Sequence, residues 1–275
     1  MQKVFEVRGP VSLQVGLAAG EIVVDASLDD RVEVELTAHG DESQQLVDAA
    51  SVELRDGSTG QEIVVDVPGK LGGFSLSTLF GRQGVSCRIR CPRGSALKAR
   101  TKSGDVTAGP ELGRADVSTA SGDVELGNVG GDLSAKTASG DLSVESVAGR
   151  MTVNSASGDI TVESVADALS VNTASGDVRV GAAGGDVKLN TASGDLRIGS
   201  VLQGRIAVNS ASGDVEIAVR RGSRVYLDCT TVSGEARSEL DVAAGEPEDE
   251  GPFAEIRART VSGDITITRA QEVHA

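Results

Sequence analysis

Hydrophobic residues along most of the chain stand two apart in short groups, and glycine-containing bends separate the groups. Val124 and Leu126 form one such group, and Leu133 and Ala135 form the next. Alternation of this kind predicts short β-strands that send every second side chain into a core. A helix would have to accept a glycine about every nine residues between 103 and 214, and each would cost about 1 kcal/mol relative to alanine. This part of the chain is therefore predicted to be all β.

The tripeptide Ser-Gly-Asp sets the spacing of these strands. It recurs every 18 residues, and the last regular copy follows after 19 because of an extra residue near Leu202-Gln203. A fixed period marks a repeat architecture, and each unit divides into two similar halves of nine residues. We predict a single-stranded parallel β-solenoid in which each unit makes one turn and the turns stack roughly 4.8 Å apart. The repeat aspartates are Asp105, Asp123, Asp141, Asp159, Asp177, Asp195 and Asp214.

The segments that flank the regular repeat differ from it. Residues 1–95 are predicted to form a β-rich region that caps the solenoid, with a short helix between Asp41 and Ala50. Residues 96–271 are predicted to hold the solenoid repeats, which end in two looser copies at 233–235 and 262–264. An acidic insertion loop, 239–252, is expected to interrupt the last two turns, and the chain closes with 256–267.

Stacked turns place the repeat aspartates in a column. At a separation of roughly 4.8 Å, neighbouring carboxylates repel each other by about 0.9 kcal/mol in water, so another interaction must offset the repulsion. One hypothesis is that each carboxylate accepts hydrogen bonds from the N–H groups of its own bend or from the serine two residues earlier. The alternative is a divalent cation shared between turns. Arginine or alanine in the second half of several units disfavours a continuous column of ions.

Two further columns carry uncharged polar groups. Asparagine side chains in register are predicted to hydrogen-bond along the stack as a structural ladder. They are Asn154, Asn172, Asn190 and Asn209. Pairs such as Thr173 and Ser175 resemble the Thr-x-Thr face of ice-binding solenoids, but hydroxyl groups held inside the turn are the preferred interpretation.

Two of the three cysteines lie on one predicted strand. Cys87 and Cys91 alternate with Arg88 and Arg90, so both thiols are expected to face the core. The Cys-x3-Cys spacing could form half of a zinc site, but the chain has no second pair and only two histidines. Buried structural thiols are the preferred interpretation, and no cofactor or metal is expected.

The composition narrows the classes of function. A formal net charge of −15 and a pI near 4.6 disfavour a binder of nucleic acid or of anionic membranes. The stretch between Gly81 and Val225 has no aromatic residue, so it lacks the stacking platforms that bind sugars and single strands. Charged residues lie close to Met1, where a secretory signal would need an apolar core, and the sequence has no run of 18 apolar residues. We therefore expect a cytoplasmic protein that is not inserted into a membrane.

Charge is distributed unevenly along the chain. Residues 82–102 contain seven basic and no acidic residues, and residues 239–250 contain six acidic and no basic residues. We expect these stretches to favour end-to-end or partner contacts, so an unknown protein partner and a homo-oligomer are both considered. The loop 69–84 lacks the Gly-Lys-Ser/Thr ending of a phosphate cradle and is interpreted as an interaction loop. The candidate interaction surface consists of Arg88, Arg90, Lys98, Arg100, Lys102, Phe74 and Phe80.

Three features of the sequence resemble one bacterial family. They are the N-terminal strand region, the recurring Thr-Ala-Ser-Gly-Asp-Val units and the closing Arg-Thr-Val-Ser-Gly-Asp-Ile-Thr-Ile-Thr-Arg-Ala. The chain is similar in these features to the β-strand-repeat family labelled "putative adhesin", also called the toastrack domain. This resemblance implies a β-solenoid, no established catalytic residues, and association with cell-envelope stress and signalling modules.

The leading functional hypothesis is a non-enzymatic scaffold or protein-interaction module. The alternative is a self-assembling cytoskeletal filament similar to bactofilins. An adhesin or a calcium-binding module is less favoured. A polysaccharide-active enzyme is also less favoured, because such enzymes group carboxylates and basic residues in a groove, whereas the aspartates here are evenly spread.

Overall fold

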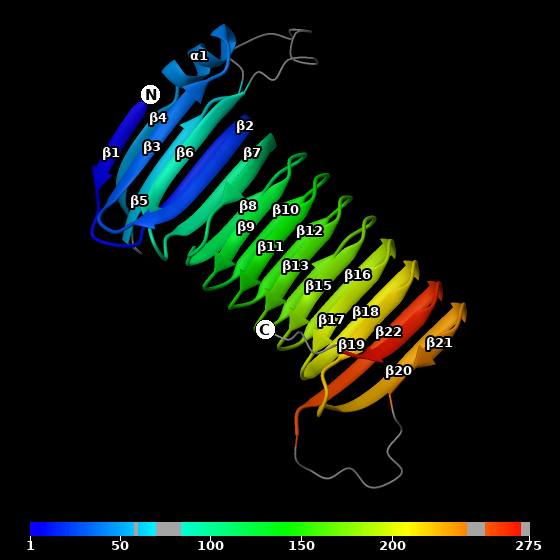
Figure 1. Ribbon diagram of the computed structural model, residues 1–275. Coiled ribbons are helices and arrows are strands. Elements are labelled where there is room, and N and C mark those ends of the chain that lie inside the picture. The colour runs from blue at the N-terminus through cyan, green and yellow to red at the C-terminus, as the bar shows by residue number, and fades with distance from the viewer. Residues whose placement is uncertain (58–59, 70–83, 241–250, 271–275) are drawn as a thin grey trace. The chain divides into compact units, whose positions relative to one another are not determined.

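The computed structural model describes residues 1–57, 60–69, 84–240 and 251–270, and the chain divides into two compact units, Met1–Ser143 and Val144–Ala275. The predicted all-β solenoid is confirmed. In each unit, strands from successive turns pair in parallel and form two layers around a row of aliphatic side chains (Figure 1). Strand β11 (Leu142–Val147) crosses the boundary between the units.

Two long strands organise the N-terminal unit. Strands β2 (Ser12–Leu28) and β7 (Ala96–Ala108) pair in parallel from Ser12 opposite Ala96 to Val24 opposite Ala108. The first half of β2 also pairs with β5 (Gly60–Val67), and its second half with β6 (Val85–Pro92), so the strand passes through both layers. It bends at Gly20, where φ is +127° and a Cβ would stand 2.1 Å from the Val85 carbonyl oxygen. Residues 12–28 thus form a solenoid turn ahead of the Ser-Gly-Asp repeats.

The remaining strands of this unit extend the two layers. In the first layer, β4 (Ser51–Gly57) pairs with β5 in antiparallel fashion, while β8 (Arg114–Ser118) and β10 (Leu133–Thr137) continue from β7 in parallel. In the second layer, β1 (Gln2–Glu6) pairs with β3 (Arg31–Ala38) and β3 with β6, both antiparallel, while β9 (Val124–Val129) follows β7. The predicted short helix is α1 (Asp41–Asp48), which packs on β3 and β6 and buries Ser43 and Val47.

The C-terminal unit repeats one turn many times. One layer contains β12 (Met151–Ser155), β14 (Leu169–Asn172), β16 (Val187–Ser193) and β18 (Gly204–Ser212). The other contains β13 (Ile160–Val165), β15 (Val178–Ala183), β17 (Leu196–Val201) and β19 (Val215–Val219). The extra residue of the 19-residue unit lies in the bend between β17 and β18, because Ala183 pairs with Val201 but Val187 pairs with Ile206.

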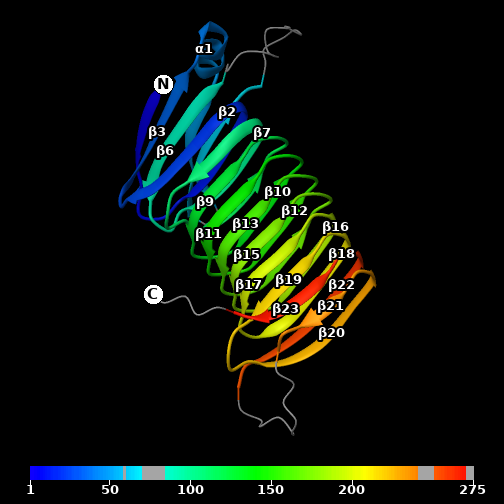
Figure 2. The ribbon, with the colours of Figure 1, turned by 45° about the vertical axis from the view of Figure 1, so that its right-hand side comes forward.

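The last turns do not stack in sequence order. Strands β20 (Arg224–Ser233) and β21 (Ala236–Ser238) precede β22 (Phe253–Ser262) and β23 (Ile265–Arg269) in the chain. In space, β22 lies between β18 and β20, and β23 lies between β19 and β21 (Figures 1 and 2). The closing segment of the sequence is therefore an internal turn, and residues 224–238, called the open turn below, form the outermost described one.

The burial of the inward side chains follows this order. The inward side chains of β22, Ala254, Ile256 and Ala258, are fully buried because a strand covers them on each side. The equivalent side chains of β20 are Val225, Leu227 and Cys229, and all three are half-buried. Ile256, which β18 and β20 cover from the two sides, contributes about 1.5–3 kcal/mol through burial. Among the described residues, no helix is long and apolar enough to cross a membrane.

Candidate functional site

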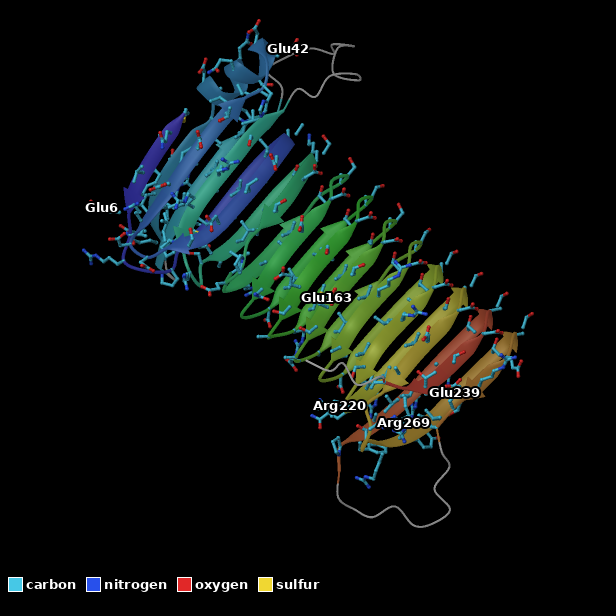
Figure 3. The ribbon with its side chains drawn as sticks, viewed as in Figure 1. Glu6, Glu42, Glu163, Arg220, Glu239 and Arg269 are labelled. Atoms are coloured by element: carbon cyan, nitrogen blue, oxygen red, sulfur yellow. The ribbon has the colours of Figure 1, made fainter. Side chains whose placement is uncertain are left out.

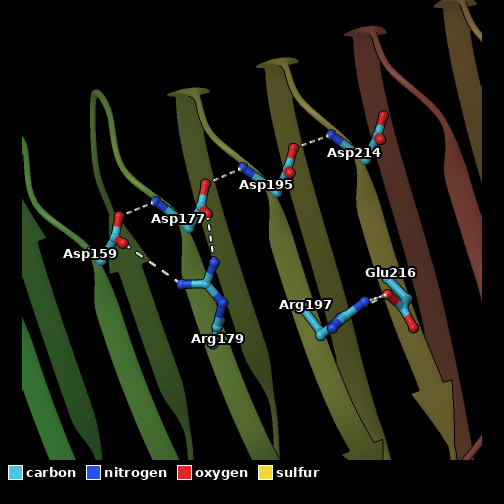
Figure 4. A network of polar contacts seen from close by, with 7 residues as sticks. All are labelled: Asp159, Asp177, Arg179, Asp195, Arg197, Asp214 and Glu216. Atoms are coloured by element: carbon cyan, nitrogen blue, oxygen red, sulfur yellow. Dashed lines mark hydrogen bonds and ion pairs between the residues drawn. The ribbon is translucent and has the colours of Figure 1, made fainter.

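The repeat aspartates form a hydrogen-bonded ladder. Oδ1 of Asp177 accepts the backbone N–H of Asp195 at 3.0 Å, and Oδ1 of Asp195 accepts that of Asp214 at 2.9 Å (Figure 4). The same bond joins Asp105 to Asp123 and Asp123 to Asp141 in the N-terminal unit. The donor is the backbone amide of the next turn rather than one in the same bend. Each carboxylate therefore holds two turns together, which offsets the repulsion within the column.

The second carboxylate oxygen faces solvent and neighbouring cations. Arg179 donates to Oδ2 of Asp177 at 2.7 Å and lies 3.7 Å from Oδ2 of Asp159, and the Arg197 guanidinium pairs with Glu216 beside the ladder (Figure 4). In the described parts of the chain, no three His, Cys, Asp or Glu side chains are grouped so that they could hold a metal ion. The aspartate ladder is thus connected through backbone amides and arginine side chains.

Substitution of one ladder residue separates the hydrogen bond from the charge. Asp195→Asn keeps an acceptor oxygen and removes one repelling charge, so the free energy of unfolding should stay unchanged or rise slightly, and any rise should shrink in high salt. Asp195→Ala leaves the N–H of Asp214 without its partner and should lower that free energy by about 0.5–1.5 kcal/mol. Urea unfolding at low and high salt measures both. Equal stability of the two variants would show that the hydrogen bond contributes nothing.

The other polar columns also serve the stack. Amide groups of Asn154, Asn172, Asn190 and Asn209 bond in series, with Nδ2 to Oδ1 distances of 3.2, 2.8 and 3.0 Å. The hydroxyl groups bond within each bend: Thr173 Oγ1 donates to the Ser175 carbonyl oxygen at 2.8 Å, and Thr191 and Ser210 repeat this bond two residues ahead. These side chains therefore stabilise the bends from inside.

The cysteines lie in apolar surroundings. Cys87 and Cys91 are fully buried on β6, as the alternation of the strand predicts. Burial raises the pKa of the Cys87 thiol to about 12 and that of Cys91 to about 11. Cys229 is half-buried on β20, and burial raises its pKa as well. All three are free thiols, and Cys229 is the one with access to solvent.

The described residues of the candidate interaction surface do not form one patch. Arg88 and Arg90 are exposed on β6 in the second layer, where Arg90 pairs with Glu33 at 3.1 Å and lies 3.8 Å from Asp25. Lys98 and Arg100 lie on the first half of β7, in the other layer, and Lys102 follows them into the bend. The positive charge of residues 84–102 is therefore divided between two faces and partly neutralised. Phe74, Phe80 and acidic residues 241–250 lie outside the described residues.

A groove of about 1040 Å³ crosses the outer face of β15, β17, β19 and β23. Small residues, including Gly181, Gly199 and Ala218, line it, and Arg220, Arg269 and Glu239 gather at one end (Figure 3). Arg269 donates to the Arg220 carbonyl oxygen at 3.4 Å. Sequence reasoning missed this groove, because its residues share only small size and come from turns 18 or 19 residues apart. Its rim carries exposed charges of both signs and does not select one ligand.

Comparison with known proteins places the repeat in a family. The model of the family described as Toastrack DUF4097 matches residues 12–268, nearly the whole chain. The chain belongs to the Toastrack DUF4097 family. Among curated proteins, no sequence matches this Toastrack chain.

Solved structures resemble this Toastrack chain at low identity. A "putative adhesin" from Bacteroides fragilis is 12% identical, with a TM-score of 0.44, and the match covers 97% of this chain and 96% of that one. A "putative adhesin" from Parabacteroides distasonis is 13% identical, with a TM-score of 0.40 and the same coverage. A "putative lipid binding protein" from Parabacteroides distasonis is 11% identical, with a TM-score of 0.36 and coverage of 98% and 96%.

The open turn differs from every inner turn of the C-terminal unit. Four of the large hydrophobic side chains exposed on this Toastrack chain lie on it or on β22 beside it: Tyr226 at 53%, Val232 at 79%, Phe253 at 48% and Val261 at 55%. Its inward row is also half-exposed, whereas the inward rows of β18 and β22 are buried. Exposed apolar side chains beside an uncovered core row are typical of a surface that contacts another protein.

Proposed function

We propose that this Toastrack chain is a non-enzymatic scaffold or protein-interaction module that contacts a protein through its open turn. The observation that carries the proposal is the half-buried row Val225, Leu227 and Cys229, which continues a core whose other rows are buried. Solenoids usually protect their terminal repeats with a capping repeat, and no strand among the described residues covers the core row of the open turn on the side away from β22. A partner that covers this row would gain the burial energy that the chain leaves unused.

The recurring side chains support a binding role over a catalytic one. The aspartates, which an active site would need as acids or bases, hold successive turns together through the ladder. The proposal keeps the cytoplasmic location that the sequence leads us to expect, and a link to envelope-stress signalling follows from the family resemblance alone.

A self-assembling filament is the second candidate. It is favoured by exposed apolar residues on the edge strands of the N-terminal unit, Val4 on β1 at 56% and Leu54 on β4 at 36%. Apolar surface on such edges and on the open turn offers two kinds of contact between copies. Electron microscopy of concentrated protein tests this candidate, and discrete particles at every salt concentration would exclude it.

Site-specific photo-cross-linking in cells tests the leading proposal. The photoreactive amino acid p-benzoylphenylalanine is placed at Val232, on the open turn, or at Lys188, an exposed position on the inner strand β16. We expect protein adducts from position 232 and few from position 188. Equal yields from both, or none from either, would overturn the proposal. The mass of the adduct identifies the class of partner.

A further inference from the structure

The outer edge of β20 has backbone groups ready for another strand. Within the described residues, β20 pairs only with β22, and the N–H of Arg224 donates to the Pro252 carbonyl oxygen at 2.8 Å. Because N–H and C=O groups alternate in direction along a strand, the even-numbered residues of β20 face β22. The backbone N–H and C=O groups of Val225, Leu227, Cys229 and Thr231 therefore point away from β22. An edge of this kind is a template for pairing with another strand.

We infer that this edge pairs in antiparallel fashion with β20 of a second copy of the chain, around a two-fold axis at Cys229. The inference rests on the proposed function, because it names the partner that covers the open turn. A strand that meets its own copy across a two-fold axis must pair with itself, and an antiparallel arrangement is the one that this symmetry allows. Side chains opposite each other must also lie on the same face of the sheet.

These conditions leave two registers that use nearly the full length of residues 224–233. The axis must pass through a residue near the middle of the strand, which is either Asp228 or Cys229. An axis at Asp228 would place two carboxylates directly opposite each other, and like charges in that position are destabilising. An axis at Cys229 places Asp228 opposite Thr230 of the copy, whose hydroxyl group can donate to the carboxylate. The second register is therefore the favoured one.

The favoured register also matches the apolar side chains. On the outer face, Tyr226 stands opposite Val232 of the copy, and an aromatic residue with a β-branched one is a stabilising cross-strand pair. On the core side, Leu227 meets Thr231 and the two Cys229 side chains meet each other. The half-exposed row of each copy is then covered by the row of the other. Such self-complementarity is what favours a second copy over an unrelated strand.

The native cysteine tests the register without a new reactive group. Cα atoms of directly opposed residues in a hydrogen-bonded antiparallel pair are about 5.5 Å apart, within the range that a disulfide spans. The purified chain should have twice the 28.0 kDa mass of one chain by light scattering under reducing conditions. Mild oxidation by dissolved oxygen, which accepts two electrons and two protons from two thiols with copper phenanthroline as the catalyst, should then give a dimer that a reductant separates. Cys229→Ser should abolish this cross-link but not the doubled mass.

A displaced cysteine provides the matched control. In the variant Cys229→Ser with Val232→Cys, the thiol is more exposed, but it stands six residues from its symmetric copy, or roughly 20 Å at 3.4 Å per residue. It should therefore form no cross-link within the dimer. Adding Tyr226→Cys to that variant should restore the cross-link, because positions 226 and 232 are opposed. A monomeric mass, or cross-linking of the Cys229→Ser/Val232→Cys variant as rapid as that of the native chain, would overturn the inference. An adduct from position 232 with a different protein would then still support the proposed function.

Discussion

Gly194→Ala is expected to destabilise the C-terminal unit strongly, because the added Cβ would overlap the backbone of the adjacent turn. Gly194 has φ of +126°, and a Cβ there would stand 2.2 Å from the Gly176 carbonyl oxygen and 2.7 Å from its carbonyl carbon. Both atoms belong to the backbone of the adjacent turn, so they cannot move without shifting that turn. Backbone strain and this overlap together should lower the free energy of unfolding by about 3 to 5 kcal/mol. Urea unfolding followed by far-UV circular dichroism measures it, since the chain has no tryptophan.

Gly222→Ala is the control for Gly194→Ala. Gly222 also has positive φ, +84°, but no atom lies within 4 Å of the place that its Cβ would take. Gly222→Ala should lower the free energy of unfolding by about 1–2 kcal/mol, which is the cost of the backbone conformation alone. The difference between the two variants then measures the overlap between stacked turns. Equal losses of stability would mean that the close approach of successive bends does not constrain the repeat.

The repeat was open to prediction because one physical constraint acts on every unit. Each bend must approach the bend of the preceding turn, so glycine recurs in a column, and the aspartate beside it recurs with the same period. Periodicity therefore fixes the layers, the parallel pairing and the inward residues. It does not fix hydrogen-bond partners. The sequence shows that Asp195 needs a donor, but a carboxylate can reach its own bend or the next turn, and only the stacked geometry makes the amide of Asp214 the donor.

The regions outside the repeat were harder to predict because their constraints are not local. Residues 12–28 lack the Ser-Gly-Asp motif, yet they form a solenoid turn because β2 finds β7 as its partner across 84 residues. The candidate interaction surface was inferred from charges close together in sequence. Alternation and a change of layer between β6 and β7 send those charges to different faces. Proximity in sequence is therefore a poor guide to a surface patch in a solenoid.

The order of the last turns leads to the second large effect, which concerns two deletions. Removing residues 252–275 takes away β22 and β23, including the buried side chains of Ile256, Ile265 and Ile267. If turns stacked in sequence order, this deletion would trim the end of the stack and leave residues 224–238 protected. In the observed order it removes the strand on which β20 lies, so the backbone amides of 224–238 should exchange rapidly as well. Hydrogen exchange measured by mass spectrometry resolves the two outcomes.

Removing residues 223–251 is the matched deletion. It takes away the open turn and joins Gly222 to Pro252, but it keeps the pairing of β22 with β18 and of β23 with β19. Residues 204–219 and 253–269 should therefore remain protected, and the loss of stability should be smaller because the removed inward side chains are half-exposed. Deletion of residues 223–251 thus removes one turn, whereas the shorter deletion of residues 252–275 disrupts two. Continued protection of residues 224–238 after loss of 252–275 would mean that β20 can pair directly with β18. The rate of alkylation of Cys229 would reveal that shift. If β20 pairs with β18, the Cys229 thiol should react at the same rate as in the intact chain. If β20 is detached, the thiol should react faster.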